Sequence, residues 1–100
     1  MKIRHTNSNP DYTIWCPGCE CAHGIWTTAD SSGGGRWTFD GNYDSPTIMG
    51  RNGSESGRSL VVKDEHGAIT CHVVIDKGML IYKADSTHLL QGTTVSMQDF

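Results

Sequence analysis

The sequence lacks long apolar runs, and it lacks an excess of charge of either sign. Its 100 residues contain 8 Lys and Arg against 11 Asp and Glu, which gives a net charge of −3. Proteins that coat nucleic acid usually carry a basic excess, so this balance disfavours a nucleic-acid partner. A membrane-spanning helix needs about 20 consecutive apolar residues, and no stretch approaches that length. We therefore expect no membrane partner either.

The N-terminal residues 1–5 also lack the apolar run of a secretory signal peptide. We therefore expect a cytoplasmic protein. Thiols stay reduced in that compartment, so the cysteines are expected to contribute a metal site rather than disulfides. Free or redox-active thiols and a pair of disulfides are the alternatives.

A helical repeat is missing as well. The chain contains 12 Gly, and no window keeps the 3.6-residue period of an amphipathic helix over three turns. The pattern predicts a mostly β fold, a small single domain (1–100) of short antiparallel strands in a meander, a sandwich or a partly open barrel. The expected strands are residues 1–5, 12–16, 24–28, 37–39, 59–63, 68–75, 79–83 and 93–97.

The C-terminal half has the clearest pattern. Apolar runs flank Gly67 and Gly78, and glycine can adopt the positive φ that tight hairpins need. This predicts a three-stranded antiparallel meander. Its central strand, 69–75, is almost continuously apolar, so we expect cover on both faces. Residues 50–58 offer little to bury, which predicts a flexible loop.

The most specific motif is Cys16-Pro17-Gly18-Cys19, here called the knuckle. Two thiols separated by Pro-Gly form a tight turn that points both sulfurs at one spot. Structural zinc is bound by four such Cys or His ligands in a tetrahedron. Only 36% of the residues are hydrophobic, and a small domain with little core benefits from a bound metal. We therefore expect a zinc ion that staples the fold.

Cys71 and His88 are expected to complete the zinc site. Cys71 lies in the central strand of the meander, so it would link the knuckle to the C-terminal half of the chain. If the Asp-Lys-Gly turn closes the next hairpin, Ile75 roughly faces Met79 and Cys71 faces Lys83. His88 then lies within a short loop of Cys71.

Two other histidines are alternatives for the fourth ligand, namely His23, four residues after Cys19, and His72. Neighbouring strand residues point to opposite faces, so His72 and Cys71 can share a metal only across a bulge. Cys21 is expected to be a small buried residue. Two thiolates from one knuckle favour a structural zinc site over a catalytic one.

A second site is predicted on the other face of the same strand. If Cys71 points to zinc, His72 points away, and His23 and Asp85 could gather beside it as general base and acid. These three are the candidate catalytic residues. The alternative is that His72 hydrogen-bonds within the core while Asp85 caps a turn.

Three tryptophans in so short a chain suggest core packing or an aromatic floor for a flat ligand such as a nucleobase. Trp37, with Arg36 beside it to meet a phosphate, is the candidate for ligand binding. His72 is a further candidate.

Together these residues resemble a family of small phage and prophage proteins of unknown function, whose members often carry the automatic name ammonia monooxygenase. The resemblance spans most of the chain but departs from the family pattern after Thr47, which leaves the structure of residues 48–58 open. It implies a phage or prophage setting and metal binding by the Cys/His set, without implying a reaction. The matching features are Cys16-Pro17-Gly18-Cys19, Ala22-His23, Trp37-x-Phe39-x-Gly41, Asp44-Ser45-Pro46-Thr47, Cys71-His72, Asp76-Lys77-Gly78, Asp85-Ser86-Thr87-His88, Gly92 and Thr94-Val95.

The leading hypothesis is a zinc-stapled binding module in the cytoplasm of a bacterial host cell. It would act on a host protein or a small nucleotide-like signalling molecule, as a counter-defence accessory would. A zinc-dependent hydrolase with a His/Asp site is the first alternative. A zinc-ribbon-like module that binds nucleic acid or belongs to a virion is the second. Exposed strand edges also suggest a homodimer.

Overall fold

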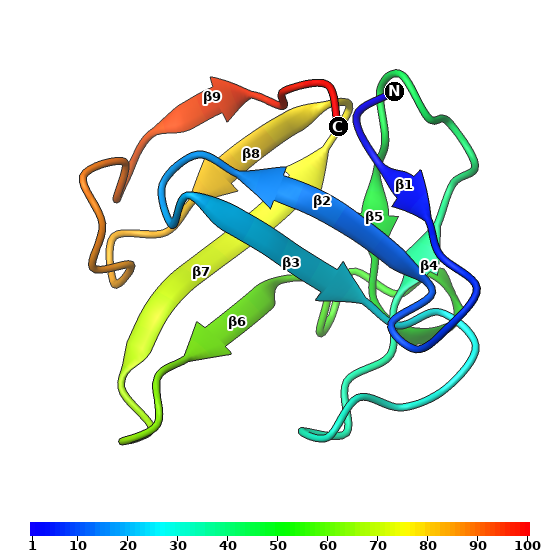
Figure 1. Cartoon of the computed structure of the whole chain (residues 1–100), viewed down its shortest axis with the longest axis horizontal. Coiled ribbons are helices and arrows are strands. Elements are labelled where there is room, and N and C mark those ends of the chain that lie inside the picture. The colour runs from blue at the N-terminus through cyan, green and yellow to red at the C-terminus, as the bar shows by residue number, and fades with distance from the viewer.

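Nine short strands joined by tight turns make up the computed structural model, which covers residues 1–100 (Figure 1). The strands pair antiparallel in three sheets, ordered β1-β2-β3, β4-β5 and β6-β7-β8-β9. The mostly β fold predicted from the sequence is therefore confirmed. The strands are β1 (Arg4–His5), β2 (Tyr12–Cys16), β3 (Cys21–Ile25), β4 (Thr38–Phe39), β5 (Ile48–Met49), β6 (Leu60–Lys63), β7 (Ile69–Asp76), β8 (Met79–Tyr82) and β9 (Thr94–Ser96).

The core lies where the first sheet packs across the last. In Figure 1, β2 and β3 pass in front of β7 and β8, and one cluster of 12 buried residues draws on both sheets. Ile14 and Ile25 come from the first sheet, and Val73, Ile75 and Leu80 from the last. Each strand places alternate side chains on its inner face, so a chain with few hydrophobic residues can still fill one core.

Strand β7 is covered on both faces, as the sequence predicted. Val73, Val74 and Ile75 are all buried. Successive side chains of a strand point to opposite faces, so three buried residues in a row require cover on each side. Strand β7 also has a pairing strand along both of its edges, β6 and β8.

A two-residue turn closes the β7–β8 hairpin, and it shifts the register by one residue from the prediction. Lys77 and Gly78 both have positive φ, 49° and 76°, as in a type I′ turn. Ile75 therefore pairs with Leu80 rather than with Met79. The prediction was wrong because it counted three residues in the turn.

The same shift changes the residue that lies beside Lys83. The Lys83 N–H donates to the carbonyl of His72 at 2.8 Å, so His72 takes the place that the prediction gave to Cys71. The β8–β9 connection still returns to this part of β7, where the Thr87 N–H donates to the carbonyl of Thr70 at 3.2 Å.

The third strand begins at Cys21 rather than at Gly24, because the knuckle is itself the turn of the β2–β3 hairpin. Turn residues 17–20 connect Cys16 to Cys21, and these two residues pair across the strands. Glu20 adopts a positive φ of 55° to complete the reversal. The knuckle therefore also sets the register of the first sheet.

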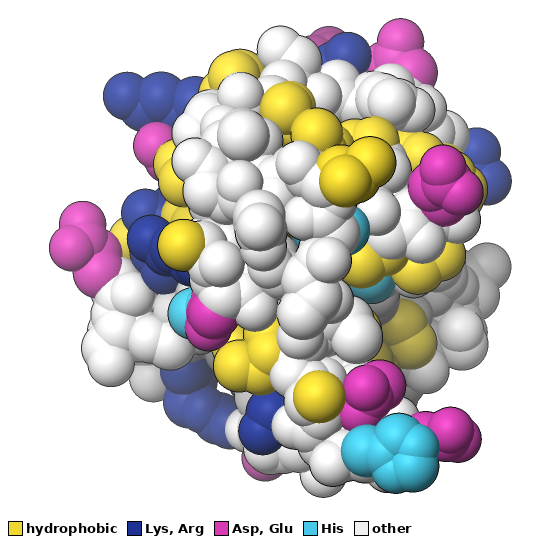
Figure 2. Space-filling model, turned by 90° about the vertical axis from the view of Figure 1, so that its left-hand side faces the viewer, with side chains coloured by type: hydrophobic (Ala, Val, Ile, Leu, Met, Phe, Trp, Pro, Cys, Tyr) yellow, Lys and Arg dark blue, Asp and Glu magenta, His cyan; other side chains and the backbone are white.

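Charged side chains of both signs are scattered over the face drawn in Figure 2, and no patch of one sign stands out there. This distribution agrees with the small net charge of −3. The helical segments of the structure include none with the length and apolar character needed to cross a membrane.

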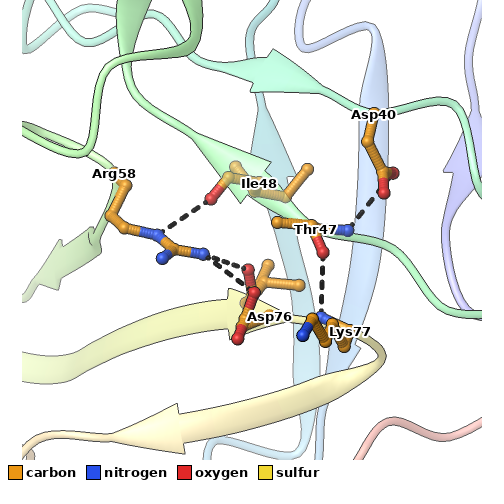
Figure 3. A network of polar contacts seen from close by, with 7 residues as sticks. Asp40, Thr47, Ile48, Arg58, Asp76 and Lys77 are labelled. Atoms are coloured by element: carbon orange, nitrogen blue, oxygen red, sulfur yellow. Dashed lines mark hydrogen bonds and ion pairs between the residues drawn. The ribbon is translucent and has the colours of Figure 1, made fainter.

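Arg58 and Thr47 join the small β4–β5 sheet to the large sheet (Figure 3). Arg58 Nε donates to the carbonyl of Ile48 at 3.2 Å, and its guanidinium lies 3.4 Å from the Asp76 carboxylate. Thr47 Oγ1 accepts the Lys77 N–H at 2.9 Å. Strand β5, which the sequence did not reveal, is held against the β7–β8 hairpin by these contacts.

Residues 51–57 are exposed, whereas Gly50 is buried and Arg58 is half-buried. A 3₁₀ turn, Arg51–Gly53, begins the loop, and Arg58 anchors its end through the contacts above. The flexibility of this loop stays a prediction.

Candidate metal centre

Four side chains from three separate segments converge between the two larger sheets. They are Cys16 and Cys19 of the knuckle, Cys71 of β7 and His88 of the loop that follows β8. Their ligand atoms all lie within 4.8 Å of one another, and Cys16 and Cys71 are buried while the other two are half-buried. The sequence predicted these four residues as ligands, and they lie close enough to bind one metal ion. They are called the metal centre below.

Cys16 receives most of the hydrogen bonds in the metal centre. Its Sγ lies 4.0 Å from Cys71 Sγ, and two thiolates on one zinc ion at ~2.3 Å would lie roughly 3.8 Å apart. The Tyr82 hydroxyl lies 3.1 Å from Cys16 Sγ, and the Cys19 N–H donates to the same sulfur at 3.4 Å. Such donors stabilise a thiolate and fix its position for a metal.

The three thiols of the metal centre differ in pKa because they differ in hydrogen bonding, in burial and in their distance from the Cys16 charge. A hydrogen bond from Cys71, with smaller ones from His23 and Tyr82, lowers the pKa of Cys16 to about 3. The same hydrogen bond, together with burial, raises the pKa of Cys71. Burial and the Cys16 charge raise the pKa of Cys19 to about 11. Metal binding at neutral pH must therefore displace protons from two of the three thiols.

His88 is fixed by contacts on three sides. Gly18 lies against the ring, since a Cβ added there would stand 2.5 Å from His88 Nδ1. The Tyr82 ring packs edge-on, with the two ring centroids 4.5 Å apart. The Leu90 N–H lies 3.2 Å from Nδ1, while Nε2 is buried without a hydrogen-bond partner. Buried polar atoms rarely lack a partner, and a metal ion held by the three thiols would supply one.

The two alternatives for the fourth ligand lie outside this group of four. His23, on β3, is buried beside Cys16, close enough to lower the pKa of that thiol. His72 points to the face of β7 opposite Cys71, because neighbouring strand residues alternate. Cys21 is exposed, so the expectation that it is buried is wrong. It stands just after the hairpin turn, at the margin of the first sheet.

His72 and Asp85 come together on the outer face of β7. His72 Nδ1 lies 3.0 and 3.1 Å from the two carboxylate oxygens of Asp85. The buried hydroxyl of Ser86 accepts the main-chain N–H of His72 at 2.9 Å and lies 3.2 Å from its carbonyl. An aspartate-oriented imidazole can act as a general base. His23 does not join this pair, and neither His72 nor Asp85 lines a cavity.

Three residues that shape these sites were not singled out from the sequence. Tyr82 ends an apolar strand, so nothing marked its hydroxyl as a partner of a thiolate. Ser86 sits in a short polar loop that looked like a turn. Gly18 was noted only as part of the knuckle, although the small space beside the His88 ring requires glycine there.

A groove of about 820 Å³ opens between the edges of β3 and β6. Trp26 and Trp37 line it, with ring centroids 6.5 Å apart and planes inclined by 37°. Of the predicted ligand-binding residues, Trp37 lines the groove, whereas Arg36 and His72 do not. Arg36 Nε instead pairs with the carboxylate of Asp30 at 3.0 Å.

Comparison of this chain with protein-family models, with curated protein sequences and with solved structures finds no match. The argument for function therefore rests on the residues and geometry described above.

Proposed function

We propose that this protein is a small binding module whose fold is held together by a structural zinc ion. The observation that supports this proposal is the convergence of Cys16, Cys19, Cys71 and His88 within 4.8 Å. Three thiolates and one imidazole are a usual donor set for structural zinc, and four protein ligands leave no position for water or substrate. Zinc then contributes to folding, and target binding takes place elsewhere on the surface.

The proposed target is a host protein, met in the cytoplasm of a phage-infected or lysogenic bacterium. A small nucleotide-like signalling molecule is the alternative target. The ordered set of motifs that resembles phage and prophage proteins supports this setting, and the groove beside Trp26 and Trp37 supports a ligand site. A module of this kind would suit a counter-defence accessory.

The metal part of the proposal is tested on protein purified without added metal. Elemental analysis should find one zinc per chain. Replacement by Co²⁺ should give the intense visible bands of a tetrahedral thiolate site. Folded protein that carries no zinc, or a cobalt spectrum of five or six ligands, would contradict a structural site.

The binding part of the proposal is tested with zinc-loaded protein in two assays. One is a pull-down from host lysate, and the other is equilibrium binding to a panel of linear and cyclic nucleotides. Capture of a specific protein or binding of one nucleotide is expected. Failure of both assays with folded, zinc-loaded protein would contradict a binding module.

A hydrolase is the second candidate, favoured by the His72–Asp85 pair alone. The four protein ligands and the lack of a cavity beside that pair count against it. A His72→Ala variant that folds and binds zinc but loses turnover would support the hydrolase over the binding module.

A further inference from the structure

Two strand edges without a pairing strand face the groove. Strand β3 ends the first sheet and β6 ends the last, so each has one unpaired edge. Consecutive residues of both strands line the groove, 22–24 of β3 and 60–63 of β6. Alternate side chains point to opposite faces, so a cavity that touches every residue in turn must lie along the edge of the strand. The groove is therefore bounded by the main chain of two strands.

On β6, Val61 has the main-chain groups that point into the groove. His72, which pairs with Val61, directs its N–H to Ser86 and its carbonyl to Lys83, both on the side of β7 away from β6. The N–H and C=O groups of an antiparallel strand alternate between its two sides, so the pairing with β7 uses the neighbours of His72 and of Val61. The N–H and C=O of Val61 are left for another strand.

The same reasoning assigns the free groups on β3. The carbonyl of Trp26 accepts the Trp37 N–H at 2.7 Å, on the side away from β2. By alternation, Ala22 and Gly24 also direct their main-chain groups outward, while Ile25 pairs with β2. Both walls of the groove thus present unpaired peptide groups.

The side chains of the groove are apolar or neutral, with one positive charge. No Asp or Glu is among the 15 lining residues, and Lys63 is the single charged one. Val61 is 45% exposed although it stands on a strand edge, where proteins usually place charges or proline to prevent pairing. Trp37 Nε1 is buried in the groove wall without a hydrogen-bond partner. These features favour an extended ligand with apolar groups, hydrogen-bond acceptors and a carboxylate.

The arrangement of the arginines disfavours a ligand rich in phosphate. Arg36 and Arg51 both contact the Asp30 carboxylate, at 3.0 and 2.8 Å, so their charges are already matched in part. Lys63 would be left as the one cation for the phosphates of a nucleotide. Recognition of phosphate normally uses a guanidinium fork or a cradle of N–H groups.

We propose that the groove binds an extended segment of a partner protein, which adds as a strand to the outer edge of β6. Its main chain pairs with Val61, its apolar side chains pack against Trp26 and Trp37, and an acidic side chain meets Lys63. Main-chain pairing supplies affinity in such complexes, while pockets for alternate side chains supply specificity. This inference rests on the proposed function and names the class of target for the groove.

A single extended chain fits the groove better than a second copy of this protein. The edge of β6 is recessed between β3 and the loop that contains Ser31 and Gly35, which also line the groove. The β6 edge of a second copy would bring the same walls with it, and we expect these to hinder the pairing of the two edges.

The test uses an array of immobilised hexapeptides built from Val, Ile, Thr, Tyr and Glu, probed with zinc-loaded protein. A matched array replaces every Glu by Lys. We expect binders in the first array and at least tenfold weaker signals for their Lys counterparts. The strongest binder is then measured in solution with N-methyl groups on alternate amides. Methylation of one set of alternate amides should weaken binding at least tenfold, and methylation of the other set should change it less than threefold.

Matched variants of the protein locate the contact. Val61→Pro removes the outward N–H and exchanges the exposed side chain, changes that a strand edge tolerates, and it should weaken binding at least tenfold. Val61→Thr keeps the N–H and the branched side chain and should bind within threefold of the parent. Circular dichroism and zinc content establish that both variants are folded. If Val61→Pro does not fold, the methylated peptides still test the pairing without altering the protein.

The other outcomes would overturn the proposal. One is an array on which the parent protein gives no signal stronger than that of the Val61→Pro variant. Another is binding that is equal for both sets of methylated peptides. A dimer in solution that Val61→Pro converts to monomer would assign the edge to a second copy. A nucleotide that binds the parent and Val61→Pro equally well would agree with a binding module but contradict a peptide as the ligand of the groove.

Discussion

Cys71 and His72 are neighbours in the chain, yet they belong to two regions of opposite character. The inner face of β7 carries Cys71 into the metal centre, where it is fully buried among three other ligands. The outer face carries His72, which pairs with a half-exposed Asp85 and borders no cavity. A Cys-His dipeptide in a strand therefore supplies two sites, because the alternation of the strand separates them.

The two faces of β7 are expected to contribute differently to the stability of the fold. The inner face joins the knuckle, β7 and the loop after β8, so its ligands connect segments that are far apart in sequence. The outer face joins β7 only to the turn that follows β8, where Asp85 lies. We expect changes on the inner face to alter metal binding and folding together, and changes on the outer face to alter neither by much.

The largest effect is expected from Cys71→Ser, which removes a buried ligand. Structural zinc contributes roughly 10–16 kcal/mol of apparent binding free energy in small domains, and a domain is stable by only about 5–15 kcal/mol. The variant should lose zinc and most of its cooperative unfolding transition, as measured by elemental analysis and thermal circular dichroism. Cys21→Ser is the matched control, because that thiol is exposed. Equal melting temperatures for the two variants would show that the metal centre does not stabilise the fold.

The next largest effect is the pH dependence of zinc affinity. The pKa of Cys71 is raised and that of Cys19 is raised to about 11, so both are thiols at neutral pH, whereas Cys16, with a pKa of about 3, is already a thiolate. Zinc uptake should release about two protons, and its affinity should rise roughly 100-fold per pH unit near pH 7. Calorimetry in buffers of different ionisation enthalpy measures the proton count. A count near zero would contradict this protonation pattern.

Gly18→Ala should weaken zinc binding by roughly 10–100-fold. The added Cβ would stand 2.5 Å from His88 Nδ1, so the imidazole must move away from the thiols. Competition with a chromophoric chelator measures the affinity. Gly33→Ala serves as control, because a Cβ there meets no atom within 4 Å. If both variants bind zinc like the parent, His88 is not a ligand.

A smaller effect, roughly tenfold in zinc affinity, is expected from Tyr82→Phe. The ring that packs on His88 is kept, and only the hydroxyl 3.1 Å from Cys16 Sγ is lost. Burial raises the pKa of Tyr82, so its hydroxyl stays protonated and able to donate. The same chelator competition applies. An unchanged affinity would show that the hydroxyl does not support the thiolate.

The smallest effect is expected from His72→Ala on the outer face. It removes a half-buried ring whose pair with Asp85 is partly exposed, and such pairs contribute about 0–1 kcal/mol. Zinc content should stay at the parent value, and the melting temperature should change by only a few degrees. Loss of zinc from this variant would contradict the prediction that only the inner face of β7 contributes to the metal centre.

The residues of the metal centre could be predicted from the sequence because the search starts from one local motif, the knuckle. The Cys-Pro-Gly-Cys spacing identifies two candidate ligands. Cys71 was the third because it lies in the central strand of the meander, and strand alternation then turns His72 away from the same metal. His88 was chosen from a hairpin register that was wrong by one residue. It still lies with the other three, because the connection after β8 returns to β7 in either register. The grouping of these four residues is therefore better determined than the exact pairing of the strands.

The groove and the supporting contacts could not be predicted, since they depend on how separate sheets pack. The predicted meander puts residues 60–63 on an outer strand, but nothing in the sequence indicates that β3 of the first sheet lies beside that edge. The contact of Tyr82 with Cys16 likewise joins strands 66 residues apart in the chain. Local patterns identify strands and turns, whereas the order of strands within a sheet is set by distant partners.

His23 lies in the wall of the groove, and it also lies beside Cys16. One imidazole therefore borders both a sulfur of the metal centre and the space proposed for a partner. The energy of the Cys16 sulfur-to-cobalt charge-transfer band depends on the hydrogen bonds to that sulfur. Cobalt-substituted protein thus carries a built-in optical probe, whose band position should shift whenever a molecule in the groove engages His23.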